Sequence, residues 1–347
     1  MGDIKVFLSL VEMVLCLWKC GKNSQQIIAI TAKFLMLTVT LPLASYVIIF
    51  WKMNMAKSLV FLTVLLVVLL SIGGCSTAEP EVVEPDVPRF ESAVSFHDKC
   101  ADTLKTFVNS QGMVGYKRLK RQRDELRLLL EELGRLDPDA YKSWPKEDKI
   151  AYWINTYNLQ RLKVVIDNYP ITPSSQILAS YWGPLNLRHI EGKITAYRFP
   201  VMDEQFTFAR IEKRFFKEQF DDPRIFFALT SASLSSPPLR SEPYYGHKLN
   251  EQLDDQVRRF LSSPSAFRID RAKKTVYLSA IFEVSSRGKE IGEKFATDRK
   301  FKDHQPPTRA ALNFISSYIS QNDKSFLEMG EYSVKYMKHD WTINDGS

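Results

Sequence analysis

Four serines stand close together in the segment 230–237, and the chemistry that they could support is acyl transfer. They are Ser231, Ser233, Ser235 and Ser236. A serine hydroxyl acts as a nucleophile when a neighbouring base accepts its proton, and histidine is the usual base. Ser231 and Ser236, with His247 in the next segment, are therefore the candidate catalytic residues of a hydrolase. Gly-x-Ser-x-Gly is absent, however, and a turn whose hydroxyls hydrogen-bond the backbone is the alternative interpretation.

The histidines do not form a metal-binding pattern. The chain has five of them: His97, His189, His247, His304 and His339. No two have the spacing of ligands on one helix face, and no carboxylate motif stands beside them. None of the 14 glycines belongs to a phosphate-binding loop. The sequence therefore predicts no metal site and no cofactor.

Two asparagines interrupt the most apolar helical segment of the chain. Asn155 and Asn158 are three residues apart, so they face the same side of a helix. A buried amide costs about 1–3 kcal/mol unless it is hydrogen-bonded. One interpretation is a polar cluster that holds neighbouring loops such as 230–240, and the other is a pocket that faces a substrate. Arg240 is a candidate partner in both, so Asn155, Asn158 and Arg240 are the residues of this candidate pocket.

A cysteine follows a short apolar run near the N-terminus. Residues 59–70 are apolar apart from one threonine, Lys57 precedes them, and Gly73-Gly74-Cys75 follows shortly after. The run is short for a transmembrane helix and fits the core of a signal peptide. The segment resembles a bacterial lipoprotein signal, in which Cys75 becomes the lipid-bearing first residue of the mature chain. An ordinary membrane span that contains a cysteine is the alternative.

Four parts of the chain can be distinguished. They are an apolar extension (1–52), a lipoprotein signal peptide (53–74), a tether rich in Pro and Glu (75–90) and the main domain (91–347). The extension contains an uncharged stretch long enough to span a bilayer, so either the chain begins with membrane spans or translation starts at Met53 or Met55. Both versions place Cys75 on the outer side of the membrane. We therefore expect the lipid bilayer as partner through Cys75, and a location on the periplasmic side, at the outer membrane of a Gram-negative bacterium.

The charge pattern argues against a nucleic-acid partner. The net charge is +7, and the one dense cationic run, 117–127, falls within a predicted helix. Such a run could meet anionic lipid or nucleic acid, but a solvated helix face is the interpretation we prefer. Cys100 is the one cysteine of the main domain beyond Cys75, and we expect it to be buried rather than reactive.

Periodicity predicts a domain in which helices come first and strands later. We expect helices at 96–110, 118–136, from Ser143-Trp144-Pro145 to Tyr169-Pro170, at 206–220, at 245–261 and at 308–319. We expect a buried strand at 224–229, a loop at 230–243, a hairpin of 267–269 with 275–278, and a last strand at 332–341. The predicted fold class is α+β, a single domain whose helical N-terminal part packs on a small mixed sheet.

Three segments with distinctive patterns occur in order along the domain. They are 151–158 (Ala-Tyr-Trp-Ile-Asn-Thr-Tyr-Asn), 222–240 ending Ser-Ser-Pro-Pro-Leu-Arg, and 335–344 ending Asp-Trp-Thr-Ile-Asn. Together they resemble the bacterial and plant family called domain of unknown function 547, and the similarity covers most of 96–345. The resemblance implies cysteines and histidines at four positions that differ here, namely Ser231, Ser236, Lys213 and Phe226. This chain therefore lacks a thiolate nucleophile and the imidazoles that could activate it.

These observations favour a lipid-anchored envelope domain that binds a ligand or has a structural role and is not catalytic. The rival hypothesis is a hydrolase that acts through the Ser231–Ser236 loop, and the third is a membrane-bound assembly factor. The sequence does not identify the protein or small-molecule ligand. A histidine or aspartate within hydrogen-bond reach of Ser231 or Ser236 would favour the hydrolase.

The proposed lipid attachment at Cys75 can be tested by substitution. Replacing Cys75 by Ala removes the thiol that would carry diacylglycerol, so the variant should no longer incorporate a radiolabelled lipid precursor, whereas wild type should. Metabolic labelling followed by electrophoresis checks this. Equal incorporation in both proteins would show that the lipoprotein interpretation is wrong.

Overall fold

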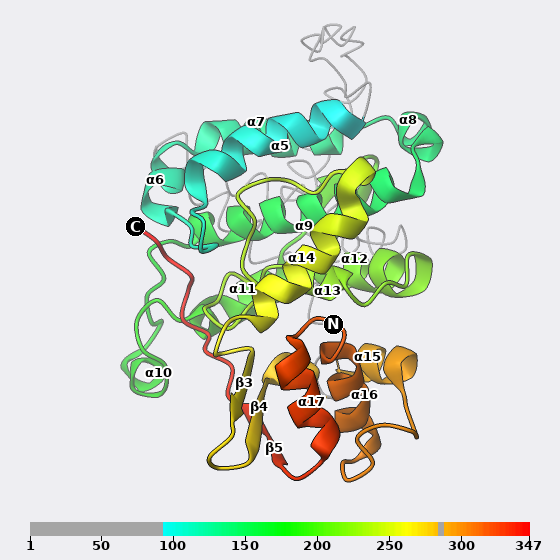
Figure 1. Ribbon diagram of the computed structural model, residues 1–347. Coiled ribbons are helices and arrows are strands. Elements are labelled where there is room, and N and C mark those ends of the chain that lie inside the picture. Colours follow the sequence, from blue (N-terminus) through cyan, green and yellow to red (C-terminus); the bar gives the residue numbers. More distant parts are fainter. Residues whose placement is uncertain (1–92, 284–287) are drawn as a thin grey trace, which may run out of the picture. The chain divides into compact units, whose positions relative to one another are not determined.

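The computed structural model describes residues 93–283 and 288–347 (Figure 1). The apolar extension, the signal peptide, the tether and Cys75 lie outside the described residues, as do the predicted domain boundaries. Among the described residues, no helix combines the length and the apolar composition needed to cross a bilayer. The first described elements are all helices: α5 (Ala93–Phe107), α6 (Tyr116–Arg121), α7 (Arg123–Gly134), α8 (Pro138–Ser143) and α9 (Lys146–Asp167).

Helix α9 is the central element of this helical part. Glu147 and Asp148 lie in its first turn, where carboxylates complement the helix dipole. Nearly every residue from Ile150 to Ile166 is buried, because α5, α6, α7 and α12 all pack against α9. The prediction of a central helix that is apolar on more than one face is confirmed. The buried Cys100 on α5 also agrees with its prediction.

The middle of the chain consists of short elements. They are α10 (Gln176–Tyr181), η1 (Leu187–Ile190), α11 (Glu191–Ala196), β1 (Phe199–Val201), β2 (Glu204–Phe206), α12 (Phe208–Ile211) and η2 (Glu212–Gln219). Strands β1 and β2 form an antiparallel pair. Helix η2 has π-helical hydrogen bonds, which continue to the Phe220 N–H bonded to the Phe215 carbonyl at 2.8 Å. The predicted helix 206–220 is thus present over most of its length.

The buried strand predicted at 224–229 is wrong. Residues Ile225–Ala228 form the helix α13, and all four are buried. The Asp222 side chain accepts the Arg224 N–H at 2.9 Å, which turns the chain into a helical start. A short apolar run that is buried throughout has no alternation, so periodicity alone does not distinguish a strand from a helix.

The last part of the domain combines helices with a mixed sheet. Its elements are η3 (Gly246–Lys248), α14 (Leu249–Leu261), β3 (Phe267–Asp270), β4 (Thr275–Ser279), η4 (Ala280–Phe282), α15 (Lys289–Phe295), α16 (Pro306–Ile315), α17 (Gln321–Met329) and β5 (Ser333–Met337). Strand β4 pairs antiparallel with β3, as the predicted hairpin requires, and parallel with β5. The predicted α+β class is confirmed: the described residues form a helix-rich structure with small sheets.

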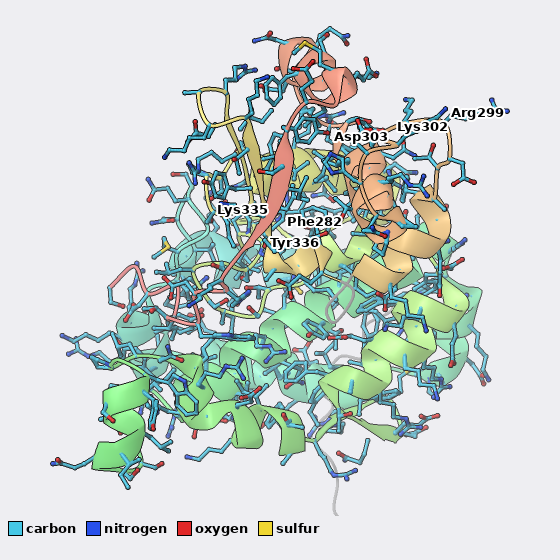
Figure 2. All side chains as sticks on the ribbon, turned by 90° about the horizontal axis from the view of Figure 1, so that it is seen from below. Phe282, Arg299, Lys302, Asp303, Lys335 and Tyr336 are labelled. Carbon is cyan, nitrogen blue, oxygen red and sulfur yellow. The ribbon has the colours of Figure 1, made fainter. Side chains whose placement is uncertain are left out.

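The cover of the mixed sheet differs from the prediction that the N-terminal helices pack on it. Val276 and Leu278 of β4 share a hydrophobic cluster with α14, α16 and α17, and not with α5 to α9. Parallel strands need a crossover connection, and the segment between β4 and β5 supplies α15 to α17 as the cover. On β5 the exposed Lys335 alternates with the half-buried Tyr336, which packs against the cluster that contains Phe282 (Figure 2).

Trp153 generates a prediction about stability. It is fully buried, its ring stacks on Phe215 with centroids 3.8 Å apart, and its Nε1–H donates to the Tyr141 hydroxyl at 2.8 Å. Trp153→Ala should lower the free energy of unfolding by about 3–5 kcal/mol, because it leaves a large cavity. Urea denaturation of the chain from Ser76 onward measures the loss.

Tyr181→Ala is the matched control for this prediction. Tyr181 is 77% exposed, so its truncation should change stability by less than about 0.5 kcal/mol. Equal effects of the two substitutions would contradict the central place of α9.

Candidate functional site

Asn158 fixes the start of the serine-containing segment. It is buried; its Oδ1 accepts the Thr230 N–H, and its Nδ2 donates to the Ala228 carbonyl, both at 2.9 Å. The amide thus satisfies backbone groups on either side of Leu229. These are the hydrogen bonds that a loop-holding role requires.

Asn155 fixes the far end of the same segment. Its Oδ1 accepts the Tyr244 N–H at 2.9 Å and its Nδ2 donates to the Tyr244 carbonyl at 2.8 Å. Because these two bonds set the orientation of the amide, Nδ2 also faces the ring of His97, whose Nδ1 lies 2.9 Å away. An N–H group needs an acceptor, so His97 Nδ1 is unprotonated and the ring is neutral.

Arg240 lies apart from both asparagines. Its guanidinium donates to Asp255 of α14 at 2.5 Å and to Glu242 at 2.6 Å, and it lies over the Tyr244 ring. The three residues of the candidate pocket therefore do not share one hydrogen-bond network. Asn155 and Asn158 contact backbone, and Arg240 is held by carboxylates.

The serine segment makes its own chain of hydrogen bonds. The Ser231 and Ser233 Oγ atoms are 2.8 Å apart, and Ser233 Oγ is 2.8 Å from His339 Nε2. Ser236 Oγ instead donates to the Pro237 carbonyl at 3.1 Å. His247 lies on η3 and makes no hydrogen bond to these serines among the described residues. The imidazole that reaches the segment is therefore that of His339, which sequence reasoning did not single out.

Backbone pairing explains why His339 lies here. The Leu234 N–H donates to the Thr342 carbonyl at 2.8 Å, and the Asn344 N–H donates to the Ala232 carbonyl at 3.0 Å. Ala232 has φ of +67°, a left-handed conformation that costs a non-glycine residue about 1–2 kcal/mol. The turn at Ala232 is therefore held in place by the C-terminal segment that pairs with it.

His339 is positioned as a proton acceptor. Burial, and then the positive charge of Arg188, lower its pKa, and the nearby Asp340 opposes them less strongly. A neutral imidazole can accept a proton at one ring nitrogen. If Nε2 accepts from the Ser233 hydroxyl, the Ser233 oxygen can accept from the Ser231 hydroxyl. Both hydroxyls then donate towards His339.

A cavity of about 420 Å³ lies beside this hydrogen-bonded chain. Ser231, Ser236 and His339 line it, together with apolar side chains that include Phe226, Leu229, Ile281 and Trp341. In the described part of the chain, its charged lining residues are Arg188, whose guanidinium lies 4.5 Å from the centre of the Trp341 ring, and Glu283. Neither Asn155 nor Asn158 lines this cavity. Among the described residues, no group of three or more His, Cys, Asp or Glu side chains could hold a metal ion.

The comparisons with known proteins identify one family. The model of the family described as "Protein of unknown function, DUF547" matches residues 141–261. This segment includes α9 and the serine segment, but not His339 or Trp341. The resemblance deduced from the sequence is confirmed over these residues. No curated protein and no solved structure matches the chain.

The positions at which the resemblance implies cysteine or histidine converge on the cavity. Ser231, Ser236 and Phe226 all line it. Lys213 differs: it lies on η2 with its side chain 78% exposed. Three of four altered positions therefore meet at one place, which makes the cavity the candidate functional site.

The burial of His97 predicts how the stability of the domain depends on pH. Burial lowers its pKa to about 4, with Asp98 opposing and His247 adding to the shift. The unfolded chain, with a histidine pKa of about 6.5, therefore binds more protons between pH 4 and 6.5. The contribution of the neutral His97 to stability is therefore complete above about pH 6.5. As the pH falls towards 4 this contribution is lost, and the free energy of unfolding falls by roughly 3 kcal/mol.

Urea denaturation at several pH values measures this loss. His97→Asn keeps an acceptor towards Asn155 but does not titrate, so its stability should fall less between pH 6.5 and 4. The same pH dependence in both proteins would contradict the buried, neutral state of His97.

Proposed function

We propose that this chain is a lipid-anchored envelope domain that binds a small molecule in the cavity beside the serine segment and does not transform it. The observation that carries the binding role is the cavity of about 420 Å³. Ligand sites are typically concave, mostly apolar and provided with a few polar groups, as this one is. The anchor rests on the sequence alone, through the short apolar run and Cys75.

The charges of the cavity restrict the ligand. Arg188 and Glu283 carry opposite charges, and His339 is neutral near pH 7 because its pKa is lowered. A multiply charged anion or cation would therefore gain little binding free energy from these opposite charges. The indole of Trp341 and the apolar lining fit a molecule with an apolar body, and Ser231 and His339 can hydrogen-bond a polar end. The ligand class that fits is a neutral or singly charged amphiphilic molecule.

A cavity-filling substitution tests the binding role. Ala280 lines the cavity, so Ala280→Trp should fill part of it and remove the binding of the fluorescent probe phenylnaphthylamine by the chain from Ser76 onward. Ala179→Trp on the exposed surface of α10 is the matched control and should bind as wild type does. Fluorescence titration compares the three proteins. Equal binding by Ala280→Trp and wild type would exclude the cavity as the binding site of this probe.

A hydrolase is the second candidate, because one specific observation favours it. In the chain from Ser231 through Ser233 to His339, Ser231 Oγ could attack an acyl carbon while its proton passes to Ser233. The proton of Ser233 would pass to His339 Nε2 in the same step. The bond from the acyl carbon to the alcohol or amine of the substrate would then break, and that leaving group would take the proton from His339. Water would later cleave the ester at Ser231, releasing the acid and restoring the Ser231 hydroxyl. Against this, no carboxylate among the described residues hydrogen-bonds the other ring nitrogen of His339, as in a triad.

Labelling with a fluorophosphonate separates the two candidates. We expect the purified protein to react with this serine-directed probe no faster than the probe hydrolyses, because no described carboxylate holds His339 as in a triad. Intact-mass spectrometry measures the extent of labelling. Stoichiometric labelling that Ser231→Ala and His339→Gln abolish, and that His247→Gln leaves intact, would overturn the non-catalytic proposal.

A further inference from the structure

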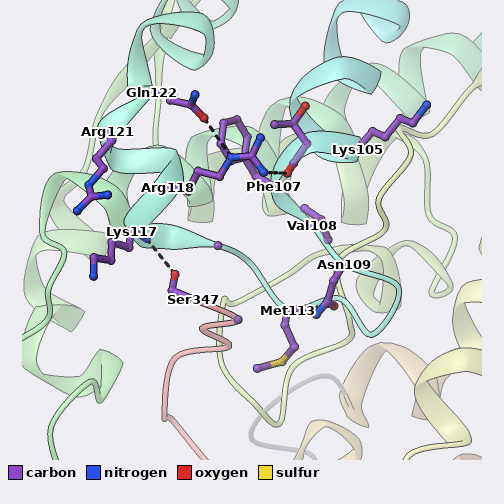
Figure 3. Close-up of a pocket in the computed structure, with 13 residues that line it drawn as sticks. Lys105, Phe107, Val108, Asn109, Met113, Lys117, Arg118, Arg121, Gln122 and Ser347 are labelled. Atoms are coloured by element: carbon purple, nitrogen blue, oxygen red, sulfur yellow. Dashed lines mark hydrogen bonds between the residues drawn. The ribbon is translucent and has the colours of Figure 1, made fainter.

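In a groove at the end of α5 and along α6, the charged side chains of the described residues are all basic. It has a volume of about 760 Å³, and its charged side chains are Lys105, Lys117, Arg118 and Arg121 (Figure 3). No aspartate or glutamate side chain of the described residues lines this basic groove. Figure 3 shows Lys117 and Arg121 towards one end, Lys105 towards the other, and Arg118 lying over Phe107 between them.

Within the described part of the chain, no carboxylate side chain pairs with these cations. Lys105, Lys117 and Arg121 are exposed and form no ion pair among the described residues. Among the described residues, the acceptors of Arg118 are both neutral: the Gln122 side chain at 3.2 Å and the Thr106 carbonyl at 3.4 Å. Four like charges in one groove repel one another, so their arrangement does not stabilise the fold. An anionic partner would account for it.

By contrast, Arg127 on the following helix forms ion pairs with carboxylates. Arg127 on α7 lies 2.7 Å from Glu131 and 3.6 Å from Asp124. Carboxylates thus neutralise a cation one helix further along, and the groove stays positive. This contrast separates the basic groove from an ordinary helix surface with mixed charges.

The rest of the groove is apolar or uncharged. Phe107, Val108 and Met113 line it, and Met113 is half-buried. A phospholipid headgroup presents phosphate oxygens to cations and carbon atoms of its glycerol to apolar surface. Both kinds of contact are offered here, whereas an inorganic phosphate would use only the first.

We infer that the basic groove binds the headgroups of anionic phospholipids and holds the domain against a membrane surface. The inference rests on the anchor proposed above, which would keep the domain near a bilayer. Fully extended, the segment 76–92 would span at most roughly 60 Å, so the reach of the domain from Cys75 is limited. Each cation near an anionic membrane surface raises the affinity for that surface on the order of fivefold. Four cations together therefore contribute substantially to membrane binding.

Lysine acetylation of the reconstituted full chain tests the inference. The chain is placed in vesicles of phosphatidylcholine alone or of phosphatidylcholine with phosphatidylglycerol, and modified lysines are quantified by mass spectrometry. Lys105 and Lys117 should react about fivefold more slowly when phosphatidylglycerol is present. High salt should restore their reactivity. Lys302, exposed on the loop between α15 and α16, should react equally in both vesicles (Figure 2).

Charge reversal supplies the matched comparison. Lys117→Glu with Arg121→Glu should remove the protection of Lys105 by phosphatidylglycerol. Arg299→Glu with Lys302→Glu makes the same change of charge on exposed residues of a distant loop in the sequence and should leave that protection intact (Figure 2).

Three results would overturn the inference. One is equal reactivity of Lys105 and Lys117 in the two kinds of vesicle, and another is protection that survives Lys117→Glu with Arg121→Glu. The third is equal protection by inorganic phosphate or by an oligonucleotide, which would assign the groove to a soluble anion or a nucleic acid. Flotation of the vesicles reports the anchor separately: a chain that does not float refutes the anchor, whereas a chain that floats without protection refutes only the groove.

Discussion

Two buried amides on one helix hold the segment on which the candidate site depends. Asn158 bonds the backbone at Ala228 and Thr230, and Asn155 bonds both backbone groups of Tyr244. The chain between these points has no helix and no paired strand beyond a single bridge at Ser233, so its backbone groups need partners elsewhere. Each buried backbone group left unpaired would cost about 1–3 kcal/mol. The rigid, core-packed α9 therefore determines where the serine segment lies.

The C-terminal segment holds the same region from the other side. Asn344 donates its N–H to the Ala232 carbonyl and its side-chain Nδ2 to the Gly112 carbonyl, and its Oδ1 accepts from the Tyr116 hydroxyl. Gly112 itself has φ of +81°, and a Cβ there would lie 2.7 Å from Pro238, so only glycine allows this close approach. The end of the chain thus connects the first helices with the serine segment, and it carries His339 and Trp341 to the cavity.

Local patterns in the sequence were sufficient for what local physics decides. The apolar faces of α9, the β3–β4 hairpin and the burial of Trp153 follow from periodicity and turn signals, and the hydrogen bonding of Asn155 and Asn158 follows from the cost of burying an amide. Pairings between distant segments were not predictable in this way. The parallel pairing of β4 with β5 decides which helices cover the sheet, and the pairing of Ser233 with Ile343 decides which histidine reaches the serines. The prediction of a strand at 224–229, where the structure has α13, was wrong for a different reason. A short run that is buried throughout has no periodicity to interpret.

The chemistry of the cavity depends on the residues that stand where the resemblance implies cysteine and histidine. Phe226, Ser231 and Ser236 line one surface, so a phenyl ring and two hydroxyls stand where the resemblance implies an imidazole and two thiols. A thiol ionises near neutral pH when it has basic neighbours, whereas a serine hydroxyl does not and depends wholly on a base. His339 contacts the segment through Ser233, and no carboxylate of the residues that the structure describes hydrogen-bonds its other ring nitrogen. Compared with the residues that the resemblance implies, the cavity has one more apolar ring and lacks thiol groups, so it offers a weaker nucleophile. This difference agrees with the binding role proposed above.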